Sequence, residues 1–153
     1  MSDNFRIPLI FLLSSVFALG FAYVLEYFFN ILPCKLCIYE RIAYYVAGLL
    51  AIMCMVKNNK VLVYAMFCSY LICAIISIYH IGIELHLIHD VLGCTEQATS
   101  IEDIRNNLLN PNYSPSCDRP NYIFGISLVT WNLLYLLAVL FVSSKMYVNK
   151  PDR

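Results

Sequence analysis

Four long apolar runs in a chain of 153 residues constrain the fold more than any other feature of the sequence. A helix needs about 20 mostly apolar residues to cross a bilayer, and three of the runs reach that length. The run from Ile42 to Val56 is shorter and reaches the spanning length only if Leu36 to Tyr39 belong to the same helix. We therefore expect an all-α membrane protein, a bundle of four transmembrane helices with spans at about 7–29, 38–56, 61–83 and 123–144.

The composition supports this class of protein. Hydrophobic residues make up 61% of the chain, charged residues 13%, and the mean hydropathy is +0.70, far from the values of a soluble domain. The formal net charge is zero, so we expect no nucleic acid partner. A cleaved signal peptide is the alternative for the first run. That run is too long for one, however, and Phe21 and Tyr23 stand where small residues are wanted. We expect one membrane domain over residues 1–153.

The basic residues predict which end of the bundle faces the cytoplasm. The tail 1–6, the turn 57–60 and the tail 145–153 fall on one side and hold six of the ten Lys and Arg residues. Cytoplasmic segments carry an excess of such residues. We therefore expect both termini to be cytoplasmic, with loops at about 30–40 and 84–122 on the opposite side of the membrane.

The seven cysteines divide in the same way. Four lie in the two outer loops: Cys34, Cys37, Cys94 and Cys117. Three lie within the spans: Cys54, Cys68 and Cys73. A cysteine in a span usually behaves as a small buried hydrophobe, and we interpret these three so. Thiol pairs on the outer face of a membrane meet an oxidising compartment, where disulfides form and persist.

The segment Pro33-Cys34-Lys35-Leu36-Cys37-Ile38-Tyr39-Glu40-Arg41 indicates redox chemistry. Two cysteines three residues apart can close a tight disulfide, and this spacing is where thiol pKa values are lowered most. If a helix begins near Pro33, both sulfurs lie in its first turn, where the helix dipole favours a thiolate. Arg41 shares a helix face with both cysteines. Its guanidinium can stabilise a thiolate or polarise a bound carbonyl.

Three arrangements could use the four outer cysteines. Zinc usually takes two close pairs of ligands, whereas Cys94 and Cys117 are 23 residues apart, so we expect no metal. Two inert structural disulfides are the second arrangement. A four-helix bundle in lipid needs no such link, however, and the short Cys34–Cys37 loop constrains little chain entropy. The third is exchange between a Cys34–Cys37 disulfide and a Cys94–Cys117 disulfide, and it uses all four cysteines.

The second outer loop is predicted to contain one short helix. Ser100 is a suitable N-cap, and Glu102 and Asp103 follow it in the first turn. The helix could be an ordinary surface helix over the bundle, or it could lie in the plane of the membrane interface.

Three blocks of sequence resemble one family, in the same order along the chain. They are Pro-Cys-x-x-Cys-Ile-Tyr-Glu-Arg at 33–41, Tyr-His-Ile-Gly-Ile-Glu at 79–84, and Cys117-Asp118 followed by Phe-Gly-Ile-Ser at 124–127 and Trp131-Asn132. With its four spans, the chain is similar to the bacterial disulfide bond formation protein B (DsbB) family. These inner-membrane enzymes reoxidise the periplasmic thiol oxidase DsbA with quinone. The resemblance implies a bacterial inner-membrane protein with two cysteine-bearing periplasmic loops.

The resemblance also implies a route for electrons. A thiol of a reduced DsbA-like, thioredoxin-fold protein would attack Cys94, and Cys117 would then exchange with Cys34. Cys37 would deliver the electrons to a quinone, ubiquinone or menaquinone, held beside Arg41. A DsbA-type disulfide has a potential near about −120 mV, so only a strongly oxidising acceptor can drain such a partner.

The end of the third span carries further candidates. His80 and Glu84 lie one helical turn apart on one face. In the resembled family the polar end of this span lies near the quinone, so both residues are predicted to line its site. His86 and His89 follow, but the spacing completes no metal site. Glu26 lies inside the first span, and we expect its side chain to reach out to the interface.

Two other functions stay open on the sequence. The chain could be a non-catalytic membrane scaffold or a metal-handling protein with structural cysteines, which stable and unreactive disulfides would favour. It could also be a quinone reductase of the vitamin K epoxide reductase type, another four-helix membrane thiol enzyme. In that type the Cys-x-x-Cys motif sits at the last span, whereas here it follows the first.

Overall fold

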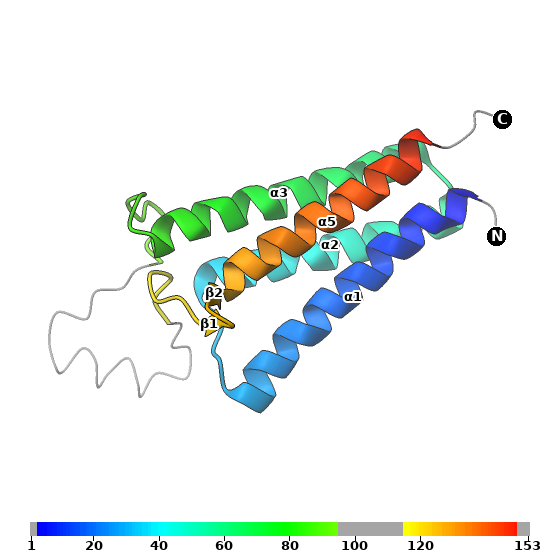
Figure 1. Cartoon of the computed structure of the whole chain (residues 1–153). Coiled ribbons are helices and arrows are strands. Elements are labelled where there is room, and N and C mark those ends of the chain that lie inside the picture. Colours follow the sequence, from blue (N-terminus) through cyan, green and yellow to red (C-terminus); the bar gives the residue numbers. More distant parts are fainter. Residues whose placement is uncertain (1–2, 95–114, 150–153) are drawn as a thin grey trace, which may run out of the picture.

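The computed structural model describes residues 3–94 and 115–149 (Figure 1). It contains four long helices: α1 (Asp3–Phe29), α2 (Lys35–Lys57), α3 (Lys60–Glu84) and α5 (Leu128–Val148). Each is long and apolar enough to cross a membrane, which confirms the predicted four-helix membrane fold. Both termini lie at the same end of the bundle, and the cysteine-bearing segments lie at the other (Figure 1). The short helix predicted from Ser100 lies outside the described residues.

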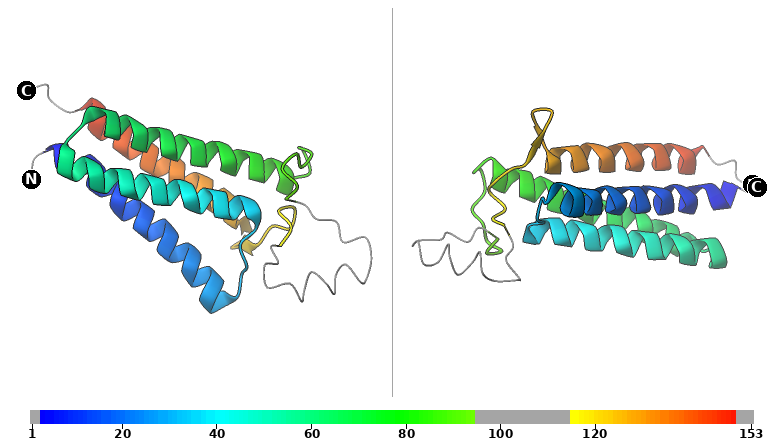
Figure 2. Two further views of the ribbon diagram at one scale, coloured as in Figure 1. Left: turned by 180° about the vertical axis from the view of Figure 1, so that it is seen from behind. Right: turned by 90° about the horizontal axis from the view of Figure 1, so that it is seen from below.

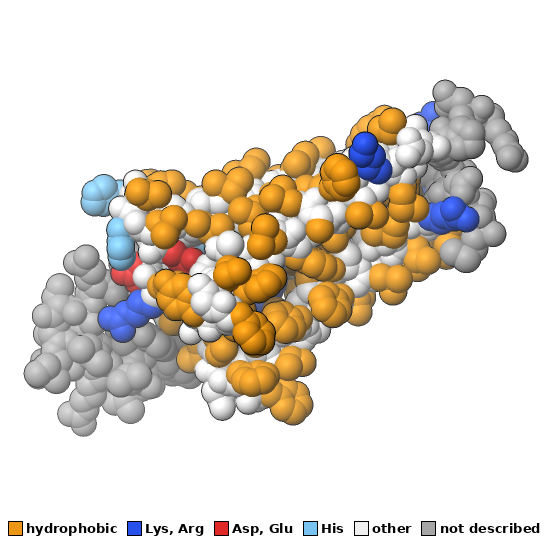
Figure 3. Space-filling model, viewed as in Figure 1, with side chains coloured by type: hydrophobic (Ala, Val, Ile, Leu, Met, Phe, Trp, Pro, Cys, Tyr) orange, Lys and Arg blue, Asp and Glu red, His pale blue; other side chains and the backbone are white. Residues whose placement is uncertain are grey.

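Apolar side chains cover the outside of the bundle as well as its inside. In the space-filling view, hydrophobic groups cover the long sides of the molecule and charged groups gather towards its two ends (Figure 3). Fully buried side chains fill the interior, including Phe11, Met66, Tyr70 and Leu136. Phe11 and Tyr70 meet edge to face, with ring centroids 4.8 Å apart. A molecule with an apolar surface over this length is suited to lipid rather than water.

Caps fix the positions of the helix ends. Cys34 is the N-cap of α2, and its sulfur accepts a hydrogen bond from the Cys37 backbone N–H. At the other end, Asn58 adopts a left-handed conformation with φ 44°, and its N–H donates to the Cys54 carbonyl. Asn59 then caps α3, since its side chain accepts from the Val61 N–H at 2.9 Å. Helix α2 thus begins at Lys35, with Cys34 just before its first turn rather than within it.

A small β-hairpin precedes the last helix. Strands β1 (Tyr122–Ile123) and β2 (Ile126–Ser127) pair antiparallel. Phe124 and Gly125 have φ 53° and φ 79°, as a two-residue hairpin turn requires. Ser127 ends the hairpin and caps α5 by accepting from the Thr130 N–H at 3.2 Å. The fourth helix therefore begins at Leu128 rather than at 123.

Helix α1 leaves the bundle towards its C-terminal end. It inclines away from the other helices as it approaches Phe29 (Figures 1 and 2). The chain then turns back through Asn30, whose φ is 53°, and the Ile31 N–H donates to the Leu25 carbonyl at 3.1 Å. This inclination leaves room between α1 and the other helices at the end of the bundle that carries the cysteines.

Candidate functional site

A cavity of about 460 Å³ occupies that room. Most of its wall is apolar and comes from α1 and α5, with Phe17, Leu25, Leu128 and Trp131 among the lining residues. Every predicted site residue except Cys94 lines it: Cys34, Cys37, Arg41, His80, Glu84 and Cys117. The fold thus gathers residues from the first outer loop, the end of α3 and the second outer loop at one place.

The motif cysteines lie side by side at the start of α2. Their sulfurs are 2.8 Å apart, and the Cys37 N–H donates to Cys34 Sγ at 3.3 Å. All seven cysteines of the chain are free thiols in this structure. The Cys34–Cys37 and Cys94–Cys117 disulfides therefore stay predictions; the first pair is hydrogen-bonded, and the second packs in one buried cluster.

Cys117 connects the two pairs of thiols. Its side chain packs in one buried cluster with those of Cys34, Cys94 and Leu36, the last from the first turn of α2. Its own N–H donates to the Cys94 carbonyl at 3.3 Å. The hydrogen bond from Cys34 is the main cause that lowers the pKa of Cys117 to about 6, against the effect of burial. Cys117 therefore carries negative charge more readily than an ordinary thiol.

The partners of Cys117 respond in the opposite direction. The pKa of Cys34 is raised, first by its hydrogen bond to Cys117 and then by that to Cys37, since Cys34 shares its proton with both. Burial raises the pKa of Cys94 to about 12. Cys94 packs in one buried cluster with Cys34 and Cys117. All four outer cysteines therefore meet at one end of the bundle, and the second loop contributes two of them.

Arg41 is held by an acid of the neighbouring helix. Its Nη1 donates to Glu26 Oε2 at 2.5 Å, and its Nη2 donates to the Ala22 carbonyl at 3.4 Å. The guanidinium also lies 5.1 Å from the centre of the Tyr23 ring. We expected the Glu26 side chain to reach out to the interface; the structure adds that it pairs with Arg41 of α2. The sequence signal for this ion pair was an acid near the end of the first span and a base near the start of the second, separated by a short connection.

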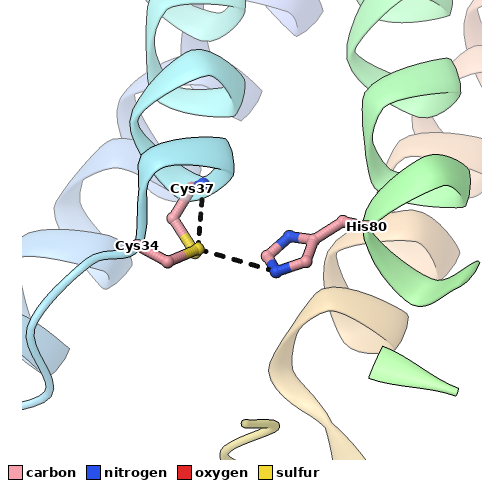
Figure 4. A group of neighbouring side chains, drawn as sticks. All are labelled: Cys34, Cys37 and His80. Atoms are coloured by element: carbon pink, nitrogen blue, oxygen red, sulfur yellow. Dashed lines mark hydrogen bonds between the residues drawn. The ribbon is translucent and has the colours of Figure 1, made fainter. Parts of the chain in front are cut away.

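His80 reaches the motif from α3. Its Nε2 lies 3.5 Å from Cys34 Sγ, and the ring points at the start of α2 (Figure 4). The other ring nitrogen, Nδ1, lies 3.6 Å from Glu40 Oε1. The histidine is therefore placed between the cysteine pair and a carboxylate.

Glu40 is the functional candidate that the sequence reasoning missed. It is buried within the span of α2 and accepts hydrogen bonds from Ser77 Oγ and Asn132 Nδ2, each at 3.0 Å. The Tyr44 hydroxyl donates to Asn132 Oδ1 at 2.7 Å. The signal was available, because an ionisable residue inside a span is a functional candidate by default.

The remaining candidates lie at the edge of the site. Glu84 lines the cavity at the last residue of α3. His86 and His89 are exposed beyond it and do not line the cavity. Lys35, between the motif cysteines, donates from Nζ to the Gly93 carbonyl at 3.0 Å. This bond ties the segment before Cys94 to the start of α2.

Comparison with known proteins agrees with this architecture. The family model described as disulfide bond formation protein DsbB matches residues 4–146, nearly the whole chain. The chain is also 29% identical over 161 aligned positions to the uncharacterized protein RP370 of Rickettsia prowazekii (strain Madrid E), covering 99% of this chain and 93% of that protein. No solved structure matches the chain.

A match over this length includes all but the outermost residues of the four helices and every cysteine of the site. The resemblance drawn from the three sequence blocks is thereby confirmed. The protein is a multi-pass membrane protein of disulfide formation with oxidoreductase chemistry, and the chain belongs to the DsbB family.

Proposed function

We propose that this chain reoxidises a soluble DsbA-like protein by thiol–disulfide exchange and passes the electrons to a quinone in the membrane. The observation that carries the proposal is the position of Cys117, which packs in one buried cluster with a cysteine of each pair, Cys34 and Cys94. Electrons that enter at the second loop can reach the motif only if a sulfur of each pair meets, and Cys117 and Cys34 do so. Inert structural disulfides would need no such contact.

The exchange begins on the loop pair. In the oxidised resting protein the disulfides would be Cys34–Cys37 and Cys94–Cys117. A thiolate of the partner attacks Cys94 and expels the Cys117 thiolate, and a thiol of low pKa leaves readily. Cys117 then attacks Cys34 and expels the Cys37 thiolate, so a Cys34–Cys117 disulfide joins the two loops.

Two further exchanges complete the transfer. The second thiol of the partner attacks the mixed disulfide, so the partner leaves oxidised and Cys94 becomes a thiolate. Cys94 then attacks Cys117, which restores the loop disulfide and leaves Cys34 reduced beside Cys37. Two electrons and two protons have then moved from the partner dithiol to the motif pair.

The cavity fits a quinone head group. Its volume of about 460 Å³ lies within the range of about 300–1,000 Å³ usual for small-molecule sites, and its walls are largely apolar. A bound quinone would take up two electrons and two protons from the motif pair. Cys37 and Arg41 lie on the same wall, so the guanidinium would orient a carbonyl beside the thiolate. His80 and Glu84 would complete the polar part of the lining.

Access to Cys94 is a requirement of the proposal. The residue is only 3% exposed, so a partner thiol cannot attack until this corner opens. Two hydrogen bonds hold the segment at Gly93 and Cys94 against the bundle: Lys35 Nζ donates to the Gly93 carbonyl, and the Cys117 N–H donates to the Cys94 carbonyl. Local opening of this segment would break both of these contacts and expose Cys94 to the partner thiol.

The proposed orientation follows from the same chemistry. We place the protein in the bacterial inner membrane, with both termini in the cytoplasm and the cysteine end in the periplasm. Disulfide exchange needs the oxidising side of the membrane. The excess of basic residues in the tails and in the turn between α2 and α3 supports this direction.

Quinone reduction by the purified protein tests the proposal. The chain is mixed with a reduced DsbA-type protein and a soluble ubiquinone analogue, and the quinone absorbance is followed. Cys37→Ser should abolish the reaction, whereas Cys68→Ser, at an exposed position of α3 outside the site, should react like the wild type. Turnover by Cys37→Ser would refute the proposal. Disulfides that neither partner nor quinone changes would favour a scaffold instead.

A further inference from the structure

We propose that the reduced protein binds one thiophilic d¹⁰ cation such as Zn²⁺, with Cys34, Cys37 and His80 as ligands. The binding itself does not depend on the proposed function. Its consequence does, because a metal on these sulfurs would block electron transfer through the same site. The spacing of the cysteines gave no reason to expect a metal, since the third ligand comes from another helix.

The ligand atoms already lie at nearly the right separations. One nitrogen of His80 and the sulfurs of Cys34 and Cys37 all lie within 4.8 Å of one another. With Zn–S of about 2.3 Å and Zn–N of about 2.0–2.1 Å, a tetrahedral site places sulfur about 3.6 Å from nitrogen and sulfurs about 3.8 Å apart. The observed Cys34 Sγ to His80 Nε2 distance is 3.5 Å (Figure 4). The Sγ–Sγ distance of 2.8 Å must widen by about 1 Å, which a side-chain rotation supplies.

A second observation concerns the far side of the histidine ring. His80 is 2% exposed, and its Nδ1 has no hydrogen-bond partner among the described residues. The nearest acceptor is Glu40 Oε1 at 3.6 Å, just beyond hydrogen-bond distance. Histidines that bind metal usually donate their other N–H to a carboxylate, which fixes the tautomer and orients the ring. A small shift of the ring towards Glu40 would make that bond and leave Nε2 facing the sulfurs.

The carboxylate is itself fixed in place. Ser77 of α3 donates to Glu40 Oε1, and Asn132 of α5 donates to Glu40 Oε2. A second lone pair of Oε1 can still accept from His80. Helix α2 supplies Glu40 and Cys37, and Cys34 caps it. A carboxylate, a histidine and two thiols therefore form one connected set, with the fourth metal position facing the cavity. Three protein ligands and one open position are the pattern of an accessible zinc site.

Binding is restricted to the reduced state by its chemistry. Each cysteine must lose its proton to bind, so one cation displaces two protons to solvent and no electron moves. In a Cys34–Cys37 disulfide the two sulfurs are bonded to each other and offer no thiolate. Metal and disulfide are therefore mutually exclusive, and free metal outside the membrane would hold the motif reduced until the metal dissociates.

Cadmium titration of the full chain tests the site. Purified protein in detergent is freed of quinone, reduced with a phosphine and titrated with Cd²⁺, whose thiolate bonds absorb in the ultraviolet. We expect one equivalent to bind, Zn²⁺ to displace it, and protein oxidised chemically with diamide to bind none. Glu40→Gln should weaken binding by about 10–100-fold, and His80→Ala, which removes a ligand, by at least as much. Cys68→Ser should bind like the wild type. Circular dichroism of each variant separates loss of the site from loss of the fold.

Each outcome decides the proposal. Equal binding by oxidised protein, or wild-type affinity in both His80→Ala and Glu40→Gln, would show adventitious chelation and refute it. Added Zn²⁺ should also slow quinone reduction, and a chelator should restore it. If quinone is reduced but no metal binds, the metal site alone is wrong. If metal binds but no quinone is reduced, the metal site stands and the proposed function fails.

Discussion

Removal of the Glu26 carboxylate should destabilise the wall of the cavity by about 2 kcal/mol. The side chains of Arg41 and Glu26 are 15% and 21% exposed, so their ion pair is neither fully buried nor fully in water. Loss of one partner from a buried pair costs about 3–5 kcal/mol because the other charge stays buried alone. Exposed pairs contribute only about 0–1 kcal/mol. Glu26→Gln lies about midway between these limits.

Arg41 keeps some of its position without Glu26. Its bond to the Ala22 carbonyl and its contact with the Tyr23 ring remain, and a cation–π contact contributes about 0.5–1 kcal/mol at exposed sites. We therefore expect Glu26→Gln to leave the protein folded and thiol exchange unchanged. The KM for a soluble quinone should rise, because the guanidinium is no longer fixed against the wall.

A double-mutant cycle measures the coupling. Glu26→Gln, Arg41→Gln and the double variant are unfolded in mixed detergent micelles with increasing SDS and followed by circular dichroism. Lys57→Gln, an exposed charge at the other end of α2, is the matched control and should change stability by less than about 0.5 kcal/mol. The double variant should be more stable than the sum of the single changes predicts. Additivity within about 0.5 kcal/mol would show that the pair is not coupled and refute the reasoning.

Three further predictions concern the second loop and the orientation. Cys117→Ser removes the resolving thiol, so a mixed disulfide through Cys94 should accumulate with a DsbA-like protein on a non-reducing gel. An adduct through the motif instead would contradict the two-pair route. Lys35→Met removes the bond to Gly93 and should speed alkylation of Cys94 by a maleimide by about tenfold, the effect of 1.4 kcal/mol. An unchanged alkylation rate would show that this bond does not keep Cys94 covered. In intact reduced cells an impermeant maleimide should label Cys94 or Cys117, and a tag after Arg153 should stay inaccessible; the reverse pattern would overturn the orientation.

The four helices could be predicted from the sequence because lipid leaves few alternatives. A backbone in the bilayer must satisfy its own hydrogen bonds, so an apolar run of about 20 residues becomes a helix. The helix ends were less predictable. The last helix begins at Leu128 because Phe124 and Gly125 turn the chain into a hairpin, and the apolar residues before it gave no sign of this.

The contacts between helices could not be predicted in the same way. In a soluble helix the apolar face marks the core, but in lipid both faces are apolar, so the pattern does not say which residues point inwards. Glu40 and His80 meet because α2 and α3 pack face to face, and their separation in sequence carries no trace of it. The spacing of the cysteines likewise could not show that Cys117 lies against Cys34.

Polar contacts inside the bundle divide the helices into two groups at the cysteine end. Glu40, Ser77 and Asn132 bind one another and join α2, α3 and α5 beside the motif. Helix α1 is fixed near its middle, where Ser14 meets the Tyr70 hydroxyl and its carbonyl accepts from Tyr135. Beyond that point the ion pair of Arg41 and the Tyr23–Tyr45 hydroxyl contact connect it to α2.

Between lipid-facing helices the hydrophobic effect supplies little attraction, so these polar contacts decide which parts hold together. Three helices thus form a fixed frame for the cysteine pair and His80. The last turns of α1 form the wall that can yield most easily. A quinone from the bilayer would enter the cavity most easily past the last turns of α1. The Glu26 variant tests the ion pair that holds these turns against α2.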